Sequence, residues 1–517
     1  MPIQFIPNDP EAKRAPKAQR ITPSSARAKG KTDFDFGTLP ALKEWPAASD
    51  EFLVLQCREA LLRALAAWED IAGPLSKWQG AKSRRKLKVH VDEGEDTNAY
   101  YDRRSLGFYH QVSSKTGRLR RFAASVDVVA HEAGHAFLDA IRPSLWDSNY
   151  PEPNAFHEAF GDCIAIVTAL SQPDLRKALL KRDPKLSRAN FVETLMESLA
   201  NGIRDEERQH NGAKPRRGRN RHQWTLPTTL PDEGGPGKLI NQSHSFGQVF
   251  VGCFYDTLRN VFVASKKRNS KALADAVLIV GRLLVRAADK APHGPRFFQA
   301  VGRTMTLEDE ALHQRKYHEA IRLAFKAHGI LLGSAAAVSP RTALKGAAPK
   351  LVRRARGRTL AKATLDDLKS RMSLPAGTPM SVRSYELGGK AIAEVCHLRA
   401  VPLGALSKQL AGVVAYGVEP ALIGGTNRRA AVLGALPDAQ MTEDEVHTYV
   451  GGLLRRGAIA FDGKGVAAKR RGGHGAVAGR TRVETHGVVR QGGKLVLKRL
   501  RYACGCCGTA AEGDRNG

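Results

Sequence analysis

Hydrophobic residues recur along this chain in patterns that predict strands first and helices later. Residues 51–72 carry leucines and Trp68 at the spacing of one helix face, so they predict an amphipathic helix. Residues 86–91 and 106–112 predict strands. Helical spacing then returns further along the chain, at residues 190–202, 246–264, 271–289, 296–304 and 308–328. Strands followed by helices favour an α+β fold.

Two more helices are predicted between those strands and the later helices, and both are apolar around most of their circumference. The first contains residues 128–137, and the second spans residues 153–168. A helix that is apolar all round is buried, yet both of these carry ionisable side chains. Buried charges are costly unless they are paired or bind a metal. The two helices therefore predict a buried polar site.

The first of these helices contains His-Glu-Ala-Gly-His at residues 131–135. Residues four apart lie on one face of a helix, so His131 and His135 can bind one metal ion, with Glu132 beside the open position of the metal. The alternative is a chance match, because the pattern occurs by accident in roughly a few per cent of chains of this length. The second helix decides between the two readings.

That second helix carries Glu158 and Asp162, which are again four residues apart and share a face. A catalytic zinc site takes three protein ligands and leaves the fourth position to water. Glu158 fits the third ligand, and Asp162 fits a carboxylate that accepts a hydrogen bond from a ligating histidine. The alternative, a solvated helix face, conflicts with the apolar neighbours Phe156 and Phe160.

Together these motifs resemble the catalytic core of the thermolysin family of zinc endopeptidases. The resemblance is most specific in Val-Asp-Val-Val-Ala-His-Glu-x-x-His at residues 126–135 and Glu-Ala-Phe-x-Asp at residues 158–162. Looser matches to the substrate-binding strands, the segment of the catalytic histidine and the closing helix lie at residues 86–93, 97–101, 242–247 and 317–329. The resemblance covers roughly residues 45–333.

The resemblance implies a two-lobed catalytic domain within the α+β class. Its β-rich N-terminal lobe, including the zinc helix, would span residues 45–143, and its helical C-terminal lobe residues 144–333. The rest of the chain predicts three segments: a basic disordered arm at 1–44, a basic linker at 334–375 and a small α+β accessory module at 376–517. Within that module, Gln-Gly-Gly at residues 491–493 predicts a hairpin.

The resemblance also implies a zinc-dependent endopeptidase. One zinc ion would be held by the two histidines and Glu158, and Glu132 would take a proton from water and pass it to the leaving nitrogen. A negatively charged tetrahedral intermediate needs hydrogen-bond donors. His244 is implied as one donor. Tyr150, eight residues before Glu158, is implied as a second, although its offset differs slightly from that of the family.

The substrate implied is a peptide or an unfolded protein. It would add in extended form to an edge strand at residues 97–101. Asn98 would bind the peptide backbone through its side chain, and Ala99 through its main chain. Arg204, in an Ile-Arg pair that resembles a Leu-Arg pair of the family, would bind a substrate carbonyl and line a pocket for large apolar residues. The alternative makes Arg204 one more surface arginine.

The formal net charge of +30 raises a second functional class. Basic residues gather in four runs, at residues 11–31, 214–221, 350–362 and 469–471. Such runs attract acidic or nucleic-acid partners, so the alternative is a nucleic-acid-associated protein that uses a protease-like fold as a scaffold, or a DNA-associated protease. Aromatic residues, at 6%, are scarce for stacking bases. A mere scaffold would not need Glu132, which favours the enzyme.

The chain holds no apolar run of membrane-spanning length, and its first residues lack the charged start and apolar core of a signal peptide. We therefore expect a cytoplasmic protein with no membrane partner. This departs from the thermolysin family, whose members are typically secreted. A non-classical secretion route would leave no mark in the sequence.

Seven cysteines in a long chain predict no disulfide framework. Cys504, Cys506 and Cys507 could join Cys396 and His397 in a second zinc site. Their spacing is irregular and lacks paired CxxC units, so the sequence favours an unstructured tail.

Calcium is not expected, although resembling secreted proteases use it for stability. Calcium prefers clustered carboxylates, and Asp127 is the one candidate near the zinc helix. The region after the Glu158 helix, residues 173–185, is mostly basic. We therefore expect Asp127 to cap the start of the zinc helix instead.

Overall fold

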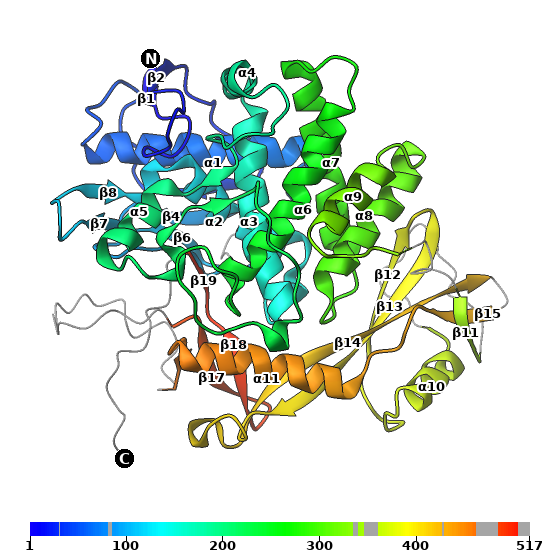
Figure 1. The fold of residues 1–517 in the computed structure, drawn as a ribbon. Helices are drawn as coiled ribbons and strands as arrows, with labels where there is room; N and C mark the ends of the chain where they lie inside the picture. Colours follow the sequence, from blue (N-terminus) through cyan, green and yellow to red (C-terminus); the bar gives the residue numbers. More distant parts are fainter. Residues whose placement is uncertain are drawn as a thin grey trace.

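The computed structural model describes residues 1–29, 31–80, 85–333, 340–345, 360–426, 429–461 and 484–504. The protein is a mixed α+β structure (Figure 1). Its helices are α1 Asp50–Ala72, α2 Val126–Ile141, α3 Pro151–Ser171, α4 Pro173–Arg182, α5 Glu197–Glu206, α6 Ser243–Val263, α7 Ser270–Lys290, α8 Phe297–His313, α9 His318–Ala327, α10 Lys362–Arg371 and α11 Ala439–Arg455.

Its strands lie in several sheets, and those of the first half of the chain are short. They are β1 Ile3–Phe5, β2 Gln19–Ile21, β3 Asp33–Asp35, β4 Lys86–His90, β5 Ala99–Tyr101, β6 Ser105–Phe108, β7 His110–Val112, β8 Leu119–Arg121, β9 Thr194–Leu195 and β10 Arg216–Arg217. The later strands are β11 Pro340–Leu344, β12 Ser381–Leu387, β13 Lys390–Pro402, β14 Val413–Thr426, β15 Arg429–Leu433, β16 Ile459–Ala460, β17 His486–Gln491, β18 Lys494–Arg499 and β19 Tyr502–Ala503.

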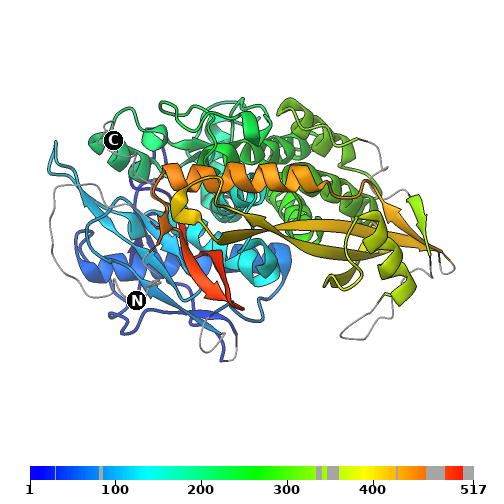
Figure 2. The ribbon, with the colours of Figure 1, turned by 90° about the horizontal axis from the view of Figure 1, so that it is seen from below.

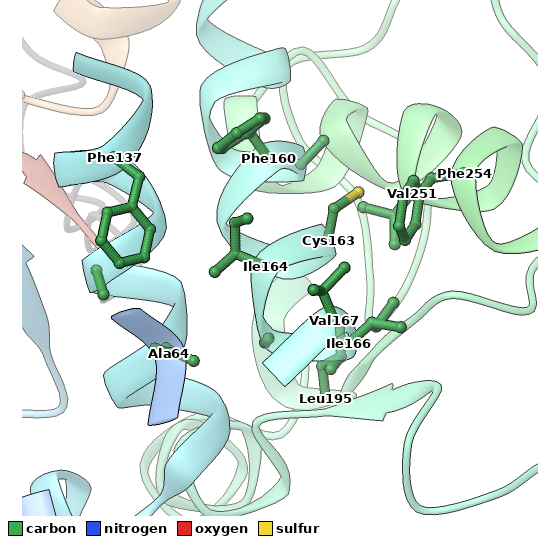
Figure 3. Close-up of a cluster of buried hydrophobic side chains, with 14 of the residues drawn as sticks. Ala64, Phe137, Phe160, Cys163, Ile164, Ile166, Val167, Leu195, Val251 and Phe254 are labelled. Carbon is green, nitrogen blue, oxygen red and sulfur yellow. The ribbon is translucent and has the colours of Figure 1, made fainter. Parts of the chain in front are cut away.

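Helices α2 and α3 form the centre of the largest hydrophobic core. Helix α2 begins where the Ser125 hydroxyl accepts a hydrogen bond from Val128 N at 3.3 Å, and α3 begins with Pro151 in its first turn. Figure 3 shows apolar side chains such as Phe137 and Phe160 filling the space around the two helices and α6. Asp127 lies in the first turn of α2, so Ser125 and not Asp127 caps this helix.

Two glycines let α2 and α3 approach closely. A Cβ atom on Gly134 would lie 2.8 Å from the Cα of Gly161, and a Cβ atom on Gly161 would lie 2.6 Å from the Nδ1 atom of His131. Larger residues would push the helices apart. The close contact places the histidines of α2 directly against the carboxylates of α3.

Helix α1 packs against α2, where Trp68 stacks on Phe137 with ring centroids 4.9 Å apart. Five strands form a sheet in the order β19-β5-β6-β4-β3. The first of them, β19, comes from the far end of the chain and pairs antiparallel with β5. In the part of the chain that the structure describes, no helix is long and apolar enough to cross a membrane.

The C-terminal region builds a second, larger sheet from β11 to β18 (Figure 2). Its long strands β13 and β14 pair antiparallel, and α11 packs on the β14 side. The predicted hairpin is confirmed, because β17 and β18 pair antiparallel around Gln491–Lys494. The region contacts the rest of the protein through a buried ion pair between Arg142 and Glu394, at 3.1 Å.

The prediction of a disordered arm at residues 1–44 is wrong. Strands β1 and β2 pair with each other, and Ile3 and Phe5 are buried. Asp9 lies in the core, where its carboxylate accepts hydrogen bonds from the hydroxyls of Ser125 at 2.7 Å and Ser198 at 2.6 Å. Basic side chains in a Pro- and Ala-rich stretch suggested disorder, but the apolar residues between them supply the anchors.

Two other segment predictions are also revised. The region 334–375 contains β11, which pairs with β15, and helix α10; residues 334–339 and 346–359 lie outside the described residues. The module at 376–517 is not separate from the N-terminal part of the chain, since β19 leaves it to join the sheet of β5. Strand pairing between residues some four hundred positions apart leaves no local pattern in a sequence.

Candidate metal centre

Three ligand atoms from α2 and α3 converge inside the protein. The Nε2 atoms of His131 and His135 lie 3.3 and 3.7 Å from the Oε2 atom of Glu158, and all three residues are buried. The four-residue spacing on α2 stacks the two imidazoles on the face that meets α3. The three ligand atoms all lie within 4.8 Å of one another.

These atoms fit a metal ion, because the protein itself leaves them unsatisfied. Among the described residues, the Nε2 atoms of both histidines and Oε2 of Glu158 have no hydrogen-bond partner, although each is shielded from solvent. A buried polar atom without a partner costs roughly 1–3 kcal/mol. Two imidazoles and one carboxylate are the ligand set of catalytic zinc sites, which keep the fourth position open.

The outer nitrogens of both histidines are held in place. Nδ1 of His131 lies 2.8 Å from Oδ1 of Asp162, and Nδ1 of His135 lies 2.8 Å from Nδ1 of His157. Burial lowers the pKa of His157 well below its usual value, so its neutral ring can accept a hydrogen bond from the Nδ1–H of His135. Both contacts leave the inner Nε2 atoms free to bind a metal. The role of His157 was missed because no spacing rule marks it.

Glu132 lies on α2 next to His131, beside the three candidate ligands. Both of its carboxylate oxygens are buried without a hydrogen-bond partner among the described residues. Burial raises the pKa of this carboxyl well above its usual value. A carboxyl of raised pKa next to a metal position is suited to accept and return a proton.

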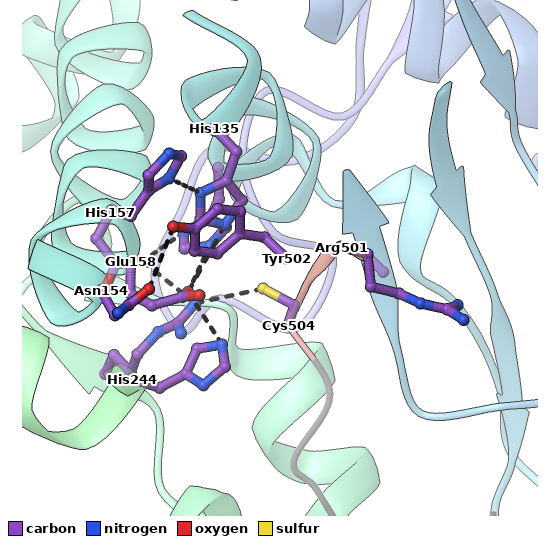
Figure 4. Close-up of polar contacts among 12 residues, drawn as sticks. His135, Asn154, His157, Glu158, His244, Arg501, Tyr502 and Cys504 are labelled. Carbon is purple, nitrogen blue, oxygen red and sulfur yellow. Dashed lines mark hydrogen bonds and ion pairs between the residues drawn. The ribbon is translucent and has the colours of Figure 1, made fainter. Parts of the chain in front are cut away.

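His244, in the first turn of α6, points into the same cluster. Its Nε2 atom lies 3.0 Å from Oε2 of Glu158, and its Nδ1 atom lies 2.6 Å from the side chain of Gln242. Burial alone would lower the pKa of His244, but the Glu158 carboxylate raises it. The structure therefore brings His131, Glu132, His135, Glu158, Asp162 and His244 into one cluster (Figure 4).

The prediction for Tyr150 does not agree with the structure. Its side chain is completely buried in the core of the C-terminal region, and its hydroxyl donates to the carbonyl of Val418 at 2.9 Å. The hydroxyl is therefore committed to a carbonyl of the C-terminal sheet. The sequence did not predict that sheet beside Tyr150, because its pattern predicted residues 376–517 as a separate module.

Arg204 is likewise placed away from the ligands, exposed on α5. Arg216 of β10 instead reaches the cluster, with its Nη2 atom 3.2 Å from Oδ1 of Asp162. Arg216 belongs to the basic run 214–221, for which the sequence suggested an acidic or nucleic-acid partner. A buried Asp162 could have indicated that such a cation is needed, because one neutral histidine does not balance the negative charge of its carboxylate.

The predicted substrate edge, Asn98 and Ala99, is present but is covered by the chain itself. Asn98 is buried, and Ala99 begins β5. Strand β19 pairs along this edge, and the backbone N–H of Cys504 donates to the carbonyl of Ala99 at 2.8 Å. The prediction of an unstructured tail is therefore wrong for Cys504; Cys506 and Cys507 lie outside the described residues.

Cys504 is buried within the metal cluster. Its sulfur forms, with His131 and Glu132, a second group whose ligand atoms lie within 4.8 Å of one another. Burial would raise the pKa of the thiol, but His131 and Arg216 lower it to about 5. In Figure 4 the side chain of Cys504 points toward Glu158 and His244, whereas Arg501 points away. Cys396 and His397, its suggested partners in a second zinc site, lie in β13 of the C-terminal sheet.

A cavity of about 530 Å³ opens beside Cys504 and His244. One wall is apolar and comes from β9, α5 and the segment before α6. Its apolar lining residues are Leu195, Met196, Leu199, Ala200, Ile203 and Ile240. Arg216, Arg455 and Arg456 form part of the remaining wall. The cavity thus offers an apolar pocket next to the metal ligands.

Compared with known proteins, the chain matches no family model and no curated protein at a significant level. The site therefore stands on its own geometry and on the residues quoted above.

Proposed function

We propose that this protein is a zinc endopeptidase. The observation that carries the proposal is the convergence of two imidazole nitrogens and one carboxylate oxygen, all buried and without a hydrogen-bond partner among the described residues, beside Glu132, whose two oxygens also lack one. A structural cluster of this size would be expected to satisfy its own hydrogen bonds. One that does not is suited to a ligand with positive charge.

The same proposal includes the finer architecture, a thermolysin-like catalytic domain. It is supported by the sheet of β3 to β6 with α1 and α2 on the N-terminal side of the cluster, and by the helices α3 to α9 that follow. The metal ligands come from the helices where these two parts meet. A cleft at such a boundary is a usual place for an active site.

In the proposed reaction, His131, His135 and Glu158 would hold the ion, while Asp162 and His157 keep the two imidazoles oriented. When bound, zinc lowers the pKa of a coordinated water and polarises a carbonyl. Glu132 accepts a proton from the attacking water and returns it to the leaving nitrogen.

His244 then donates to the oxygen that becomes negatively charged in the tetrahedral intermediate. Its raised pKa favours the protonated, donating form. Peptide backbone adds along β5, where Ala99 offers its carbonyl, and Arg216 replaces Arg204 as the cation that faces the substrate. The apolar cavity takes a large apolar side chain after the scissile bond.

The test is a Glu132→Gln variant of the full-length protein, compared with Glu310→Gln, a change at an exposed carboxylate of α8. Cleavage of casein or a peptide library should fall by about 10²–10⁴-fold in Glu132→Gln, while bound zinc measured by mass spectrometry stays at the wild-type level. Glu310→Gln should change neither. Wild-type cleavage by Glu132→Gln, or a purified protein that binds no zinc, refutes the proposal.

A further inference from the structure

We propose that Cys504 is a fourth metal ligand and that the segment 502–504 occupies the place of a substrate strand, so that the full-length chain blocks its own metal site. The inference rests on the proposed function, because it concerns the same ion. It assigns a ligand that the motifs around His131 and Glu158 do not contain. It also gives the C-terminal region a role, which is to block the metal site.

The backbone of the segment is bound as an extended peptide would be. Tyr502 pairs with Tyr101 and Ala503 with Tyr100, both antiparallel, and Cys504 N donates to Ala99 O at 2.8 Å. Strand addition at a free sheet edge is a general mode of peptide recognition. Because β19 fills this edge, a peptide can use it only after β19 has left.

The side chain of Cys504 then enters the metal cluster on the side of the general base. Its ligand atom groups with those of His131 and Glu132, whereas His135 and Glu158 complete the first group. Glu132 marks the side on which water must lie for proton transfer. A sulfur atom in this position takes the place that zinc sites keep open for water, and thiolate is a strong zinc ligand.

The surroundings of Cys504 differ from those of an ordinary buried cysteine. The Nη2 atom of Arg216 lies 3.6 Å from its sulfur, and Arg216 also faces Asp162. Cys57, Cys163 and Cys253 are buried in the same hydrophobic core, but of these four cysteines only Cys504 groups with candidate metal-ligating atoms. A thiol that faces an arginine and a group of unpaired ligand atoms is placed to coordinate an ion.

Tyr502 anchors the segment from the opposite side. Its ring stacks on His157, with centroids 3.9 Å apart, and on His135, with centroids 4.7 Å apart. The guanidinium of Arg499 lies 3.9 Å from the centroid of the same ring and donates to the hydroxyl of Tyr449 at 2.6 Å. These contacts tie the segment both to the metal-binding helices and to α11, so the sulfur is presented at a high effective concentration.

The decisive measurement is X-ray absorption at the zinc edge on the zinc-loaded, reduced, full-length protein. Wild type should show one sulfur scatterer at about 2.3 Å from zinc together with nitrogen and oxygen neighbours. Cys504→Ala should lose the sulfur signal. Cys396→Ser, which alters a half-buried thiol of β13, and a double Cys506→Ser/Cys507→Ser variant should keep it. A wild-type spectrum without sulfur, or a signal lost only in the double variant, overturns the proposal.

Activity tests the blocking role separately. Cys504→Ala should cleave an unstructured peptide about tenfold faster than wild type or more, and Cys504→Pro, which also removes the N–H that binds Ala99, should be faster still. Equal rates in wild type and both variants would refute self-blocking. Circular dichroism of each variant establishes that it is folded.

The outcomes separate this inference from the peptidase proposal. If the sulfur signal depends on Cys504 but neither Cys504→Ala nor Cys504→Pro cleaves any peptide, the coordination stands and the peptidase function fails. If sulfur is absent and wild type cleaves with dependence on Glu132, the peptidase stands and this inference fails. Glu132→Gln should therefore also be measured in the Cys504→Ala background.

Discussion

Two clusters of buried charge lie along α2, one in its middle and one at its C-terminal end, and their polar atoms are hydrogen-bonded to very different degrees. At the C-terminal end, Arg142 donates to both oxygens of Glu394, at 3.1 and 3.2 Å, and to the carbonyl of Ala291 at 3.1 Å. His293 N donates to the same carboxylate at 3.1 Å. We call this set the interface cluster, because it joins α2 to the C-terminal sheet.

The candidate metal cluster, formed by the middle of α2 and Glu158 of α3, is built from similar groups, but its inner atoms have no hydrogen-bond partner among the described residues. In both clusters, burial of charged groups costs desolvation free energy. The interface cluster offsets that cost with hydrogen bonds to the Glu394 carboxylate, whereas the inner atoms of the metal cluster have no hydrogen-bond partner among the described residues. The comparison teaches that burial of charge alone does not mark a site; unpaired atoms that face one another do.

The largest effect should come from breaking the satisfied cluster. Arg142→Ala removes the buried arginine from Glu394 and leaves it the half-buried Arg383 at 3.1 Å, so the free energy of unfolding should fall by about 3 kcal/mol. Because the metal ligands are untouched, zinc binding in the folded protein should persist. Urea denaturation with parallel zinc analysis measures both.

The matched control is Arg322→Ala, which removes a surface ion pair with Glu319 and should cost far less stability, because exposed ion pairs contribute little. If Arg142→Ala is no more destabilising than this control, the interface cluster does not hold the two regions together.

A smaller effect should follow from Asp162→Asn, which acts on the metal cluster from outside. The carboxylate holds Nδ1 of His131 and faces Arg216. Its loss should weaken zinc binding about 10- to 100-fold, since outer partners orient ligands and raise their basicity. Competition with a chelator measures the zinc Kd.

Asp174→Asn, at an exposed carboxylate of α4, should leave the zinc Kd unchanged. An Asp162→Asn protein with wild-type affinity would show that Asp162 does not support the metal ligands.

The parts of the site that the sequence predicted share a short-range signal. His131 and His135, like Glu158 and Asp162, are four residues apart on one helix, and helical geometry alone puts each pair on one face. Both helices are apolar around most of their circumference, so the sequence also indicated that they are buried and could pack on each other. Gly134 and Gly161 permit that packing, although no pattern in the sequence pointed to them.

The parts that the sequence missed depend on contacts between distant segments. Cys504 reaches the cluster through strand pairing with β5, and Tyr150 leaves it because the C-terminal sheet lies against α3. Arg216 enters through the short strand β10. Each is fixed by tertiary packing, which local periodicity does not encode. The basic N-terminal segment was misread for the same reason, since its anchors are single apolar residues such as Phe5.

The smallest effect concerns a third buried cluster, formed by Asp9, Asp127 and Glu197. Its polar atoms are hydrogen-bonded more fully than those of the metal cluster and less fully than those of the interface cluster. Burial and the neighbouring Asp127 and Asp9 raise the pKa of Glu197 from 4.5 to about 9. Folded protein thus keeps Glu197 protonated where unfolded chains ionise it. Stability should therefore fall as pH rises from about 4.5 to about 9, because the unfolded state binds fewer protons there.

Glu197→Gln removes this titration and keeps the shape of the side chain. Its melting temperature should match that of wild type below pH 4.5 and exceed it by a few degrees at pH 8, provided zinc is saturating.

Calcium should not shift the melting temperature of either protein. The Asp9 oxygens already accept hydrogen bonds from Ser125, Ser198 and the Glu11 N–H, and calcium needs six to eight oxygen ligands. A calcium-dependent rise in wild type that magnesium does not reproduce and Glu197→Gln abolishes would mean that these carboxylates are ionised around a cation. The third cluster would then be a cation site, like the proposed metal cluster, and not a group of carboxyls that the protein's own hydrogen bonds stabilise.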